Sequence, residues 1–283
     1  MQTSNFKDFL TGNELNPTEL NALIDLADQL RNERLEGKLR TDLQGKTLAL
    51  LFEKPSLRTH MSFTVAMQEL GGTAIESYSL NRKKEEPEDV GRVISGFCSA
   101  IMLRTHEHAI LERMAAKTPI PVINGLSDTH HPCQTLADLL TMKQKLGSLS
   151  GQKLAYVGDG NNTLHSLLLL LPAVGVNVSY ACPKGYEPNA FSLKKAKAIA
   201  RDMKVKIEAT NDPKTAVKNA NAIYTDVWTS MGFESEENAR EEAFEGYQVN
   251  AALYAKAAPG AIIMHCLPMV RDKEITEEMV EHP

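Results

Sequence analysis

One short polar segment has the residue types needed to bind a phosphate: Ser56, Leu57, Arg58 and Thr59. It follows the apolar run 47–52, which predicts a buried strand, and it leads into the amphipathic stretch 61–70, which predicts a helix. The first N–H groups of a helix have no intrahelical acceptor, and the helix dipole favours an anion there. Arg58 could add two parallel hydrogen bonds to a phosphate. The plainer interpretation is a helix N-cap, a position that Ser and Thr often occupy.

Four other groups of polar residues follow predicted strands. They are Arg104, the run His131-Pro132-Cys133-Gln134, the segment from Asp226 to Gly232, and the run His265-Cys266-Leu267-Pro268. Because ligands of open α/β sheets bind outside the carboxyl ends of strands, we expect these side chains to line one binding face. Each group alone has a commoner structural explanation, such as a hydrogen-bonded histidine or an ion-paired arginine. Their joint occurrence in this order is far more specific.

The elements that must position these residues alternate along the chain. Apolar runs predict strands over 47–52, 73–78, 100–104, 122–125, 153–158, 177–181, 204–209, 222–226 and 261–265. Helices are predicted over 17–36, 59–70, 88–97, 107–116, 132–146, 163–171, 190–203 and 250–257. Continuous apolar strands are typical of parallel sheets covered on both faces. The sequence therefore predicts an α/β fold with two doubly wound domains, each with a mainly parallel sheet flanked by helices.

The short polar segment 147–151 predicts a boundary between two domains, residues 1–147 and 148–283. The acidic stretch 234–245 is expected to be a mobile, solvated loop with some helix. The segment 158–162 could pass for a dinucleotide-binding turn, but it lacks the GxGxxG spacing. A plain turn between a strand and a helix is the better interpretation of that segment.

Composition limits the classes of function. The chain has 283 residues, 42% hydrophobic and 24% charged, with a net charge of -5, which predicts neither a nucleic acid nor a membrane as partner. No apolar run is long enough to span a bilayer and the N-terminus has no apolar signal core, so we expect a cytoplasmic protein. Four cysteines without a CxxC pair predict neither a disulfide framework nor a zinc site. We expect no metal and no cofactor.

Taken together, the motifs resemble those of the aspartate/ornithine transcarbamoylase family. Ser56 to Thr59 resembles its SxRT loop, and the run from His131 to Asp138 resembles its HPxQxLAD motif. Asp226 with Ser230-Met231-Gly232 resembles the DxxxSMG loop of the ornithine-specific branch, and His265 to Pro268 resembles the HCLP motif. The resemblance runs from about residue 6 to the end of the chain. It implies a homotrimer, or a multiple of trimers.

The resemblance implies transfer of the carbamoyl group of carbamoyl phosphate to the δ-amine of L-ornithine, which gives L-citrulline and phosphate. Arg58 and the N–H groups beside it suit the leaving phosphate. Arg104 and His131, with Thr59 as a further donor, suit the carbonyl oxygen as it gains negative charge. Gln134 could accept a hydrogen bond from the carbamoyl NH2 group. The same assignments follow from the resemblance, which adds Ser56, Leu57, Cys266 and Leu267 to the contacts with carbamoyl phosphate.

The amine of ornithine must lose a proton before it can attack. Asp226 and Cys266 are candidates to position and deprotonate it, and the leaving phosphate is an equally plausible proton acceptor. The resemblance implies that ornithine is held by Asn162, Asp226, Ser230 and Met231, and that Leu267–Pro268 is a cis peptide.

Two features depart from the family pattern. The family has a Gln before the segment 85–89 that reaches a neighbouring subunit's site, whereas this chain has Leu80 there. Lys83 or Lys84 could substitute, or the segment could be a solvated basic turn. The family also continues into an AENR-type motif, whose Arg contacts carbamoyl phosphate, and a final helix that packs on the first domain. This sequence ends before them, so we expect apolar surface to be exposed on the first domain.

Three alternatives stay open at the level of sequence. The acceptor could be another amine, such as an acylated ornithine. The chain could bind carbamoyl phosphate or ornithine without catalysis. The flux could run toward arginine synthesis or toward citrulline breakdown.

Overall fold

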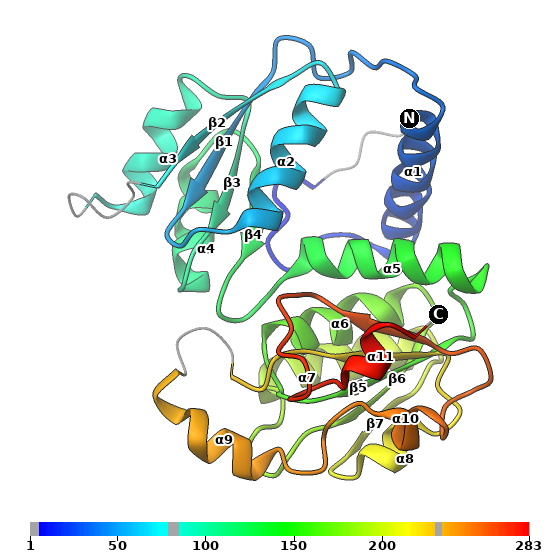
Figure 1. The fold of residues 1–283 in the computed structure, drawn as a ribbon. Helices are drawn as coiled ribbons and strands as arrows, with labels where there is room; N and C mark the ends of the chain where they lie inside the picture. The colour runs from blue at the N-terminus through cyan, green and yellow to red at the C-terminus, as the bar shows by residue number, and fades with distance from the viewer. Residues whose placement is uncertain (1–5, 79–84, 230–233, 283) are drawn as a thin grey trace. The chain divides into compact units, whose positions relative to one another are not determined.

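In a computed structural model, the chain forms two compact units, residues 1–133 and 134–283. The structure describes residues 6–78, 85–229 and 234–282. Each unit contains one parallel sheet, and Figure 1 shows both sheets with their helices. The predicted fold class, two α/β domains with parallel sheets, is confirmed. The domain boundary at residue 147 remains a prediction.

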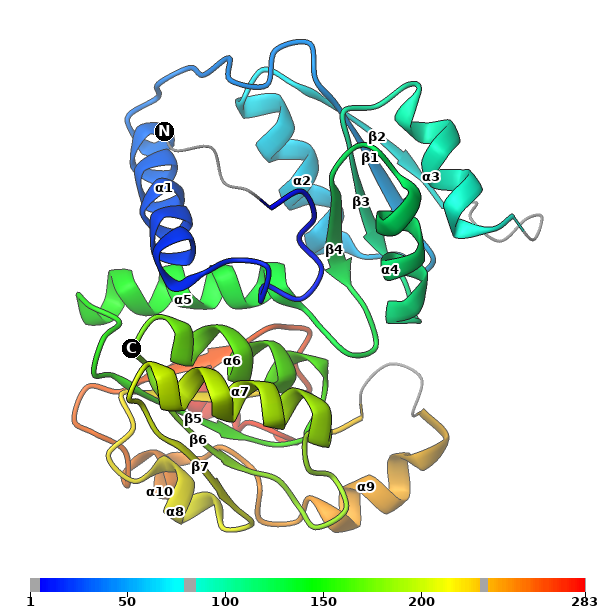
Figure 2. The same ribbon diagram turned by 180° about the vertical axis from the view of Figure 1, so that it is seen from behind.

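The sheet of the first unit has four strands in the order β2-β1-β3-β4. Helix α2 covers one face, and helices α3 and α4 cover the other (Figures 1 and 2). Alternate residues of β1 explain this division, because Leu50 packs toward Met67 of α2 whereas Leu51 packs with Leu111 and Met114 of α4. The strands are β1 Thr47–Phe52, β2 Thr73–Ser77, β3 Ala100–Arg104 and β4 Val122–Leu126, and the helices are α1 Pro17–Leu35, α2 Leu57–Glu69, α3 Pro87–Ser95 and α4 His108–Lys117.

The sheet of the second unit has five strands in the order β7-β6-β5-β8-β9. Helices α6 and α7 lie on one face, and α8 and α10 lie on the other (Figure 1). The strand order changes direction between β5 and β8, and open α/β sheets bind ligands at such a point. The strands are β5 Lys153–Val157, β6 Asn177–Ala181, β7 Ile207–Thr210, β8 Ala222–Thr225 and β9 Ile262–His265; the helices are α5 Pro132–Leu146, α6 Asn162–Ala173, α7 Ala190–Asp202, α8 Pro213–Val217, α9 Glu237–Ala243, α10 Ala251–Tyr254 and α11 Glu277–Val280, and one 3-10 turn, η1, spans Glu234–Glu236.

Local sequence explains where several elements begin. Helix α1 begins with a capping box in which Asn16 and Glu19 bond each other's backbone, followed by Pro17 in the first turn. Strand β7 begins at residue 207 rather than at the predicted 204, because Lys204 takes a left-handed conformation with φ 57° after α7. Among the described residues, no helix has both the length and the hydropathy that a membrane span requires.

The acidic stretch 234–245 was expected to be a mobile, solvated loop with some helix, and its described residues contain helix and are mostly exposed. It forms η1 and α9, and α9 is fixed by a buried arginine, Arg240, which is 4% exposed. Arg240 donates to the carboxylate of Asp159 at 2.8 Å and to the backbone oxygen of Trp228 at 3.0 Å. Arg240 therefore anchors this segment, together with Lys273, which pairs with Glu237 and Glu241 of α9.

Candidate active site

The segment 56–59 lies at the carboxyl end of β1 and opens helix α2. Ser56 occupies the N-cap position, but its side chain makes no capping hydrogen bond. Its Oγ instead donates to Oγ1 of Thr59 at 3.0 Å. The N–H groups of the first helical turn are therefore not taken by the Ser56 side chain. Arg58 is exposed and, within the described part of the chain, has no hydrogen bond or ion pair. These features favour an anion site over the plain helix cap.

The sheet places Arg104 beside the segment 56–59. It ends β3 in register with Phe52, the last residue of β1, and its Nη1 donates to Oγ1 of Thr59 at 3.3 Å. The carboxylate of Glu53 ties the two strand ends together, because its Oε2 accepts from Thr105 Oγ1 at 2.5 Å and from the N–H of His106 at 2.8 Å. Glu53 was not among the predicted site residues, although it lies just before the segment 56–59 in the sequence.

His131 follows β4 through a short loop and immediately precedes α5. Burial and the positive charge of Arg104 lower the pKa of His131 to about 3. The imidazole is therefore neutral near pH 7, so one ring nitrogen carries a hydrogen and the other does not. A neutral imidazole can donate a single hydrogen bond to a carbonyl oxygen.

Helix α5 carries Gln134, whose Nε2 donates to Oδ1 of Asp138 at 2.9 Å, one turn further along the helix. The hydroxyl of Tyr224, on β8, donates to the same oxygen at 3.4 Å. Both contacts lie within the second unit. The NH2 end of the Gln134 amide is therefore hydrogen-bonded to a buried carboxyl group.

Asp226 directly follows β8 and is buried, at 6% exposure. Its Oδ2 accepts from Asn161 Nδ2 at 2.8 Å. Its Oδ1 accepts from Cys266 Sγ at 3.0 Å and from the N–H of Val227 at 2.8 Å. Asn161 also caps α6, since its Oδ1 accepts from two N–H groups of the first turn. The carboxylate is thus held by the turn after β5 and by the loop after β9.

Cys266 is the hydrogen-bond donor in its pair with Asp226. Burial first, and then the negative charge of Asp226, raise the pKa of the Cys266 thiol well above its ordinary value. A thiol that stays protonated is a poor nucleophile. The structure therefore favours a positioning role for Cys266 over a covalent one.

The loop after β9 is fixed by His265 and Glu274. Nδ1 of His265 accepts from the N–H of Leu267 at 2.9 Å, and Nε2 lies 3.1 Å from Oε1 of the fully buried Glu274. The cis peptide predicted at Leu267–Pro268 is confirmed. Asp226, His265 and Cys266 form a group of potential metal ligands among the described residues, with ligand atoms within 4.8 Å of one another. The hydrogen bonds already described account for that proximity.

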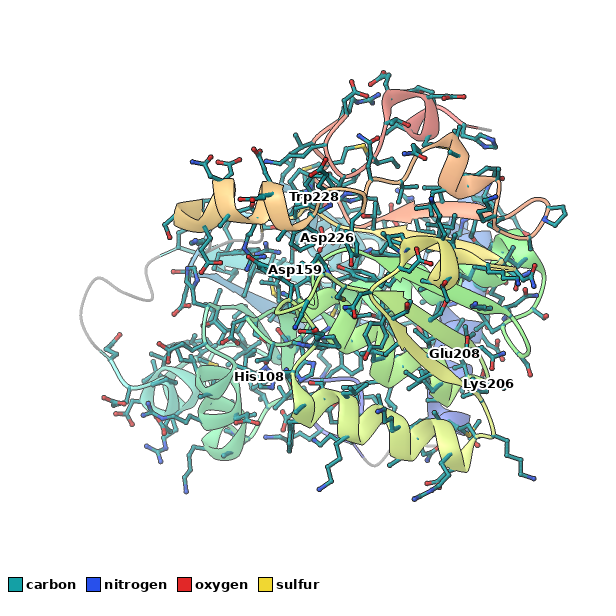
Figure 3. The ribbon with its side chains drawn as sticks, turned by 90° about the horizontal axis from the view of Figure 1, so that it is seen from below. His108, Asp159, Lys206, Glu208, Asp226 and Trp228 are labelled. Atoms are coloured by element: carbon teal, nitrogen blue, oxygen red, sulfur yellow. The ribbon has the colours of Figure 1, made fainter. Side chains whose placement is uncertain are left out.

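Figure 3 shows Asp159, Asp226 and Trp228 gathered near one end of α9, apart from Lys206 and Glu208 at the β7 side of the sheet. Asp159 lies in the turn after β5 and pairs with Arg240. Gly160 follows it, where a Cβ would come within 2.3 Å of the backbone of Glu187 and Pro188. Close backbone packing therefore explains this glycine and supports the plain-turn interpretation.

The structure brings the predicted residues together in two groups, one in each unit. Ser56, Leu57, Arg58, Thr59, Arg104 and His131 lie in the first unit, and Gln134, Asn162, Asp226, Cys266 and Leu267 lie in the second. Ser230 and Met231 lie outside the described residues, as do Leu80, Lys83 and Lys84. Sequence reasoning missed four residues that hold the site: Glu53, Asn161, Arg240 and Glu274. Each is polar and buried or part-buried, and only the fold reveals the hydrogen bonds that it makes.

Both halves of the chain match family models. Residues 7–144 match the carbamoyl-P binding domain of aspartate/ornithine carbamoyltransferase, and residues 150–283 match its Asp/Orn binding domain. Ornithine carbamoyltransferase of Bacillus subtilis strain 168 is 45% identical over 287 residues, covering 100% of this chain and 88% of that protein. The Thermus thermophilus enzyme of the same name is 46% identical, covering 98% and 89%.

Solved structures agree with these relatives. Ornithine carbamoyltransferase from Pyrococcus furiosus superposes with a TM-score of 0.94 at 41% identity, covering 98% of this chain and 90% of that one. An anabolic ornithine carbamoyltransferase from Campylobacter jejuni superposes with a TM-score of 0.92 at 34% identity, covering 98% and 91%.

Proposed function

The chain belongs to the aspartate/ornithine carbamoyltransferase family, and on that premise we propose how its residues transfer the carbamoyl group of carbamoyl phosphate to the δ-amine of L-ornithine. The amine nitrogen forms a bond to the carbonyl carbon, the bond from that carbon to the phosphate oxygen breaks, and the products are L-citrulline and phosphate. Two negative charges need stabilising during this change. One develops on the carbonyl oxygen and the other on the departing phosphate.

The phosphate is bound by Arg58 and the first-turn N–H groups of α2. The observation that carries this assignment is that Ser56 leaves those groups uncapped while Arg58 stands exposed beside them. The Thr59 hydroxyl already accepts from Ser56 and Arg104, so its own hydrogen is available to a ligand.

The carbonyl oxygen is bound by Arg104, His131 and Thr59. Preorganised donors aimed at a developing oxyanion each contribute about 3 kcal/mol to lowering the barrier. His131 contributes as a neutral donor, because its pKa of about 3 keeps it uncharged near pH 7. Gln134 accepts from the carbamoyl NH2 group, and Cys266 and Leu267 contact the same substrate.

Ornithine is held by Asp226, with Asn162, Ser230 and Met231 completing its contacts. The Asp226 carboxylate is oriented by Asn161 and Cys266, so it presents a fixed negative charge to the δ-amine. The proton lost by the amine goes to Asp226 or to the departing phosphate. The raised pKa of Cys266 makes its thiol a donor rather than a base.

Three finer assignments complete the proposal. We infer a cytoplasmic enzyme of arginine biosynthesis, in line with the anabolic relative of the same fold. We infer a homotrimer because the family resemblance implies one. The first unit exposes large apolar side chains, which suit contact with another subunit or with the family's final helix: Leu35, Leu39, Leu57, Met61, Ile75, Tyr78, Val93 and Phe97. Ile75 lies on β2, an edge strand of its sheet, where pairing or covering is the usual solution. Light scattering on the purified chain tests the trimer.

The activity is tested by measuring citrulline formation from carbamoyl phosphate with a panel of amines. The panel comprises ornithine, N-acetylornithine, putrescine and aspartate. We expect product with ornithine alone. Faster carbamoylation of another amine would contradict the acceptor assignment. A folded protein without activity on any amine at saturating substrates would support a binding role instead.

A further inference from the structure

Asp138 is a buried carboxyl group without a cationic partner among the described residues. It is 4% exposed, and its Oδ1 accepts both from Gln134 at 2.9 Å and from the Tyr224 hydroxyl at 3.4 Å. Its Oδ2 is also buried and has no hydrogen-bond partner in the described part of the chain. Both hydrogen bonds run to a single oxygen, and they come from two different elements, α5 and β8.

This arrangement sets the direction of the Gln134 amide. An ionised carboxylate only accepts hydrogen bonds, so only the NH2 end of the amide can face Asp138. The amide oxygen, Oε1, then occupies the opposite end of the group. Rotation of the amide by 180° would bring two acceptors together in a buried place, which is strongly unfavourable.

We propose that Asp138 is a positioning residue that makes Gln134 present its oxygen to the ligand, and thereby selects a ligand that carries an NH2 group beside its phosphate. The proposal rests on the contact between Gln134 and the carbamoyl group proposed above. A carbamoyl NH2 donates to an oxygen, whereas a carboxylate or a methyl group at the same place does not. Asp138 therefore discriminates carbamoyl phosphate from acyl phosphates and carboxylated analogues without touching them.

The electrostatics of Asp138 agree with this role. The pKa of its carboxyl group is raised to about 7, mainly by burial; the bonds from Gln134 and Tyr224 oppose this rise, and the nearby charge of Asp226 adds to it. A protonated carboxyl group has a donor of its own and would accommodate either orientation of the Gln134 amide. The preference for a ligand with an NH2 group is therefore strongest above pH 7, where the Asp138 carboxyl group is ionised.

The test compares three stable phosphate ligands by calorimetry at pH 8.5. Phosphonoacetamide carries an amide, phosphonoacetate carries a carboxylate at the same place, and inorganic phosphate carries neither. In Asp138→Asn the new side chain can donate to Oε1 of Gln134, so the amide is free to turn. We expect the affinity ratio of phosphonoacetamide to phosphonoacetate to fall about tenfold, with inorganic phosphate binding unchanged.

Thr135→Val is the matched control. Thr135 is fully buried on the same helix, next to Gln134, and its hydroxyl has no hydrogen-bond partner among the described residues. Its replacement leaves the Asp138–Gln134 contact intact, so the affinity ratio should equal that of the unchanged protein.

A second variant keeps the test decisive if Asp138→Asn does not fold. Tyr224→Phe removes the second hydrogen bond to Asp138 and should lower the ratio in the same direction, by about threefold. An unchanged ratio in the folded variants, or an equal loss for all three ligands, would overturn the proposal. Failure of the unchanged protein to bind any phosphate ligand would instead contradict the proposed function.

Discussion

The thiol of Cys266 donates a hydrogen bond to the carboxylate of Asp226, with 3.0 Å between Sγ and Oδ1. The contact arises because the two residues follow neighbouring parallel strands, whose last residues Thr225 and His265 are in register. A negative charge beside a buried thiol opposes formation of the thiolate. The pair therefore keeps Cys266 protonated and gives the Asp226 carboxylate a fixed orientation.

Cys266 should react slowly with iodoacetamide at pH 8, because its pKa lies well above its ordinary value. Asp226→Asn removes the negative charge that raises this pKa and should speed the alkylation about tenfold, as measured by mass spectrometry. Cys98 serves as an internal control, since burial alone raises its pKa. Equal alkylation of Cys266 in both proteins would show that burial, not Asp226, controls the thiol.

Asp226→Asn should also raise the KM for ornithine by about tenfold or more, because a charged hydrogen-bond partner of the amine is lost. The KM for carbamoyl phosphate should change much less. Steady-state kinetics with each substrate varied in turn measures both constants. Asp202→Asn, an exposed carboxylate on α7, is the control. Equal changes in the two KM values would assign Asp226 a structural role.

Arg58→Ala should weaken the binding of inorganic phosphate and of phosphonoacetamide about 30-fold, because charge-assisted hydrogen bonds to a phosphate are lost. The free energy of unfolding should hardly change, since Arg58 is exposed. Calorimetry and urea unfolding measure the two quantities. Arg201→Ala, a mostly exposed arginine on α7, should alter neither. Unchanged phosphate affinity in Arg58→Ala would refute the anion site.

His131→Asn should lower kcat about 100-fold through loss of a donor to the carbonyl oxygen. It should leave the pH dependence between pH 5 and 8 unchanged, because a histidine with a pKa of about 3 does not titrate in that range. The pH profile of kcat/KM for both proteins is the measurement. Disappearance of an inflection between pH 6 and 7 in the variant would show that His131 titrates near its ordinary pKa.

Asp138 should make the protein less stable as the pH rises from 4 to 7. Its pKa is about 7 in the folded chain, against an ordinary value of about 3.9, so the folded state holds a proton that the unfolded state has lost. The free energy of unfolding contributed by this proton falls by up to about 1.4 kcal/mol per pH unit across that window. Urea unfolding at each pH should show this slope in the unchanged protein and its loss in Asp138→Asn. Parallel curves for the two proteins would contradict the raised pKa.

Local patterns were sufficient to predict most elements and the motifs they carry. The strand 47–52 and the helix 132–146 were predicted with the bounds that the structure has, because apolar continuity and amphipathic spacing depend on neighbouring residues alone. The sequence did not predict how the segment 234–245 is anchored, because nothing local distinguishes its one buried arginine, Arg240. Arg240 finds its partner Asp159 at a distance of 81 positions along the chain, which no local pattern contains.

The sequence by itself determined the two α/β sheets, the residue types at the strand ends and their resemblance to carbamoyltransferases. Only the tertiary structure decided how those residues are used: that Ser56 does not cap α2, that His131 is neutral, that Cys266 is a donor, and that Asp138 orients Gln134. The physical reason is that hydrogen-bond direction and pKa depend on burial and on partners brought together by the sheet. Motif spacing specifies which groups are present, and packing specifies their protonation and orientation.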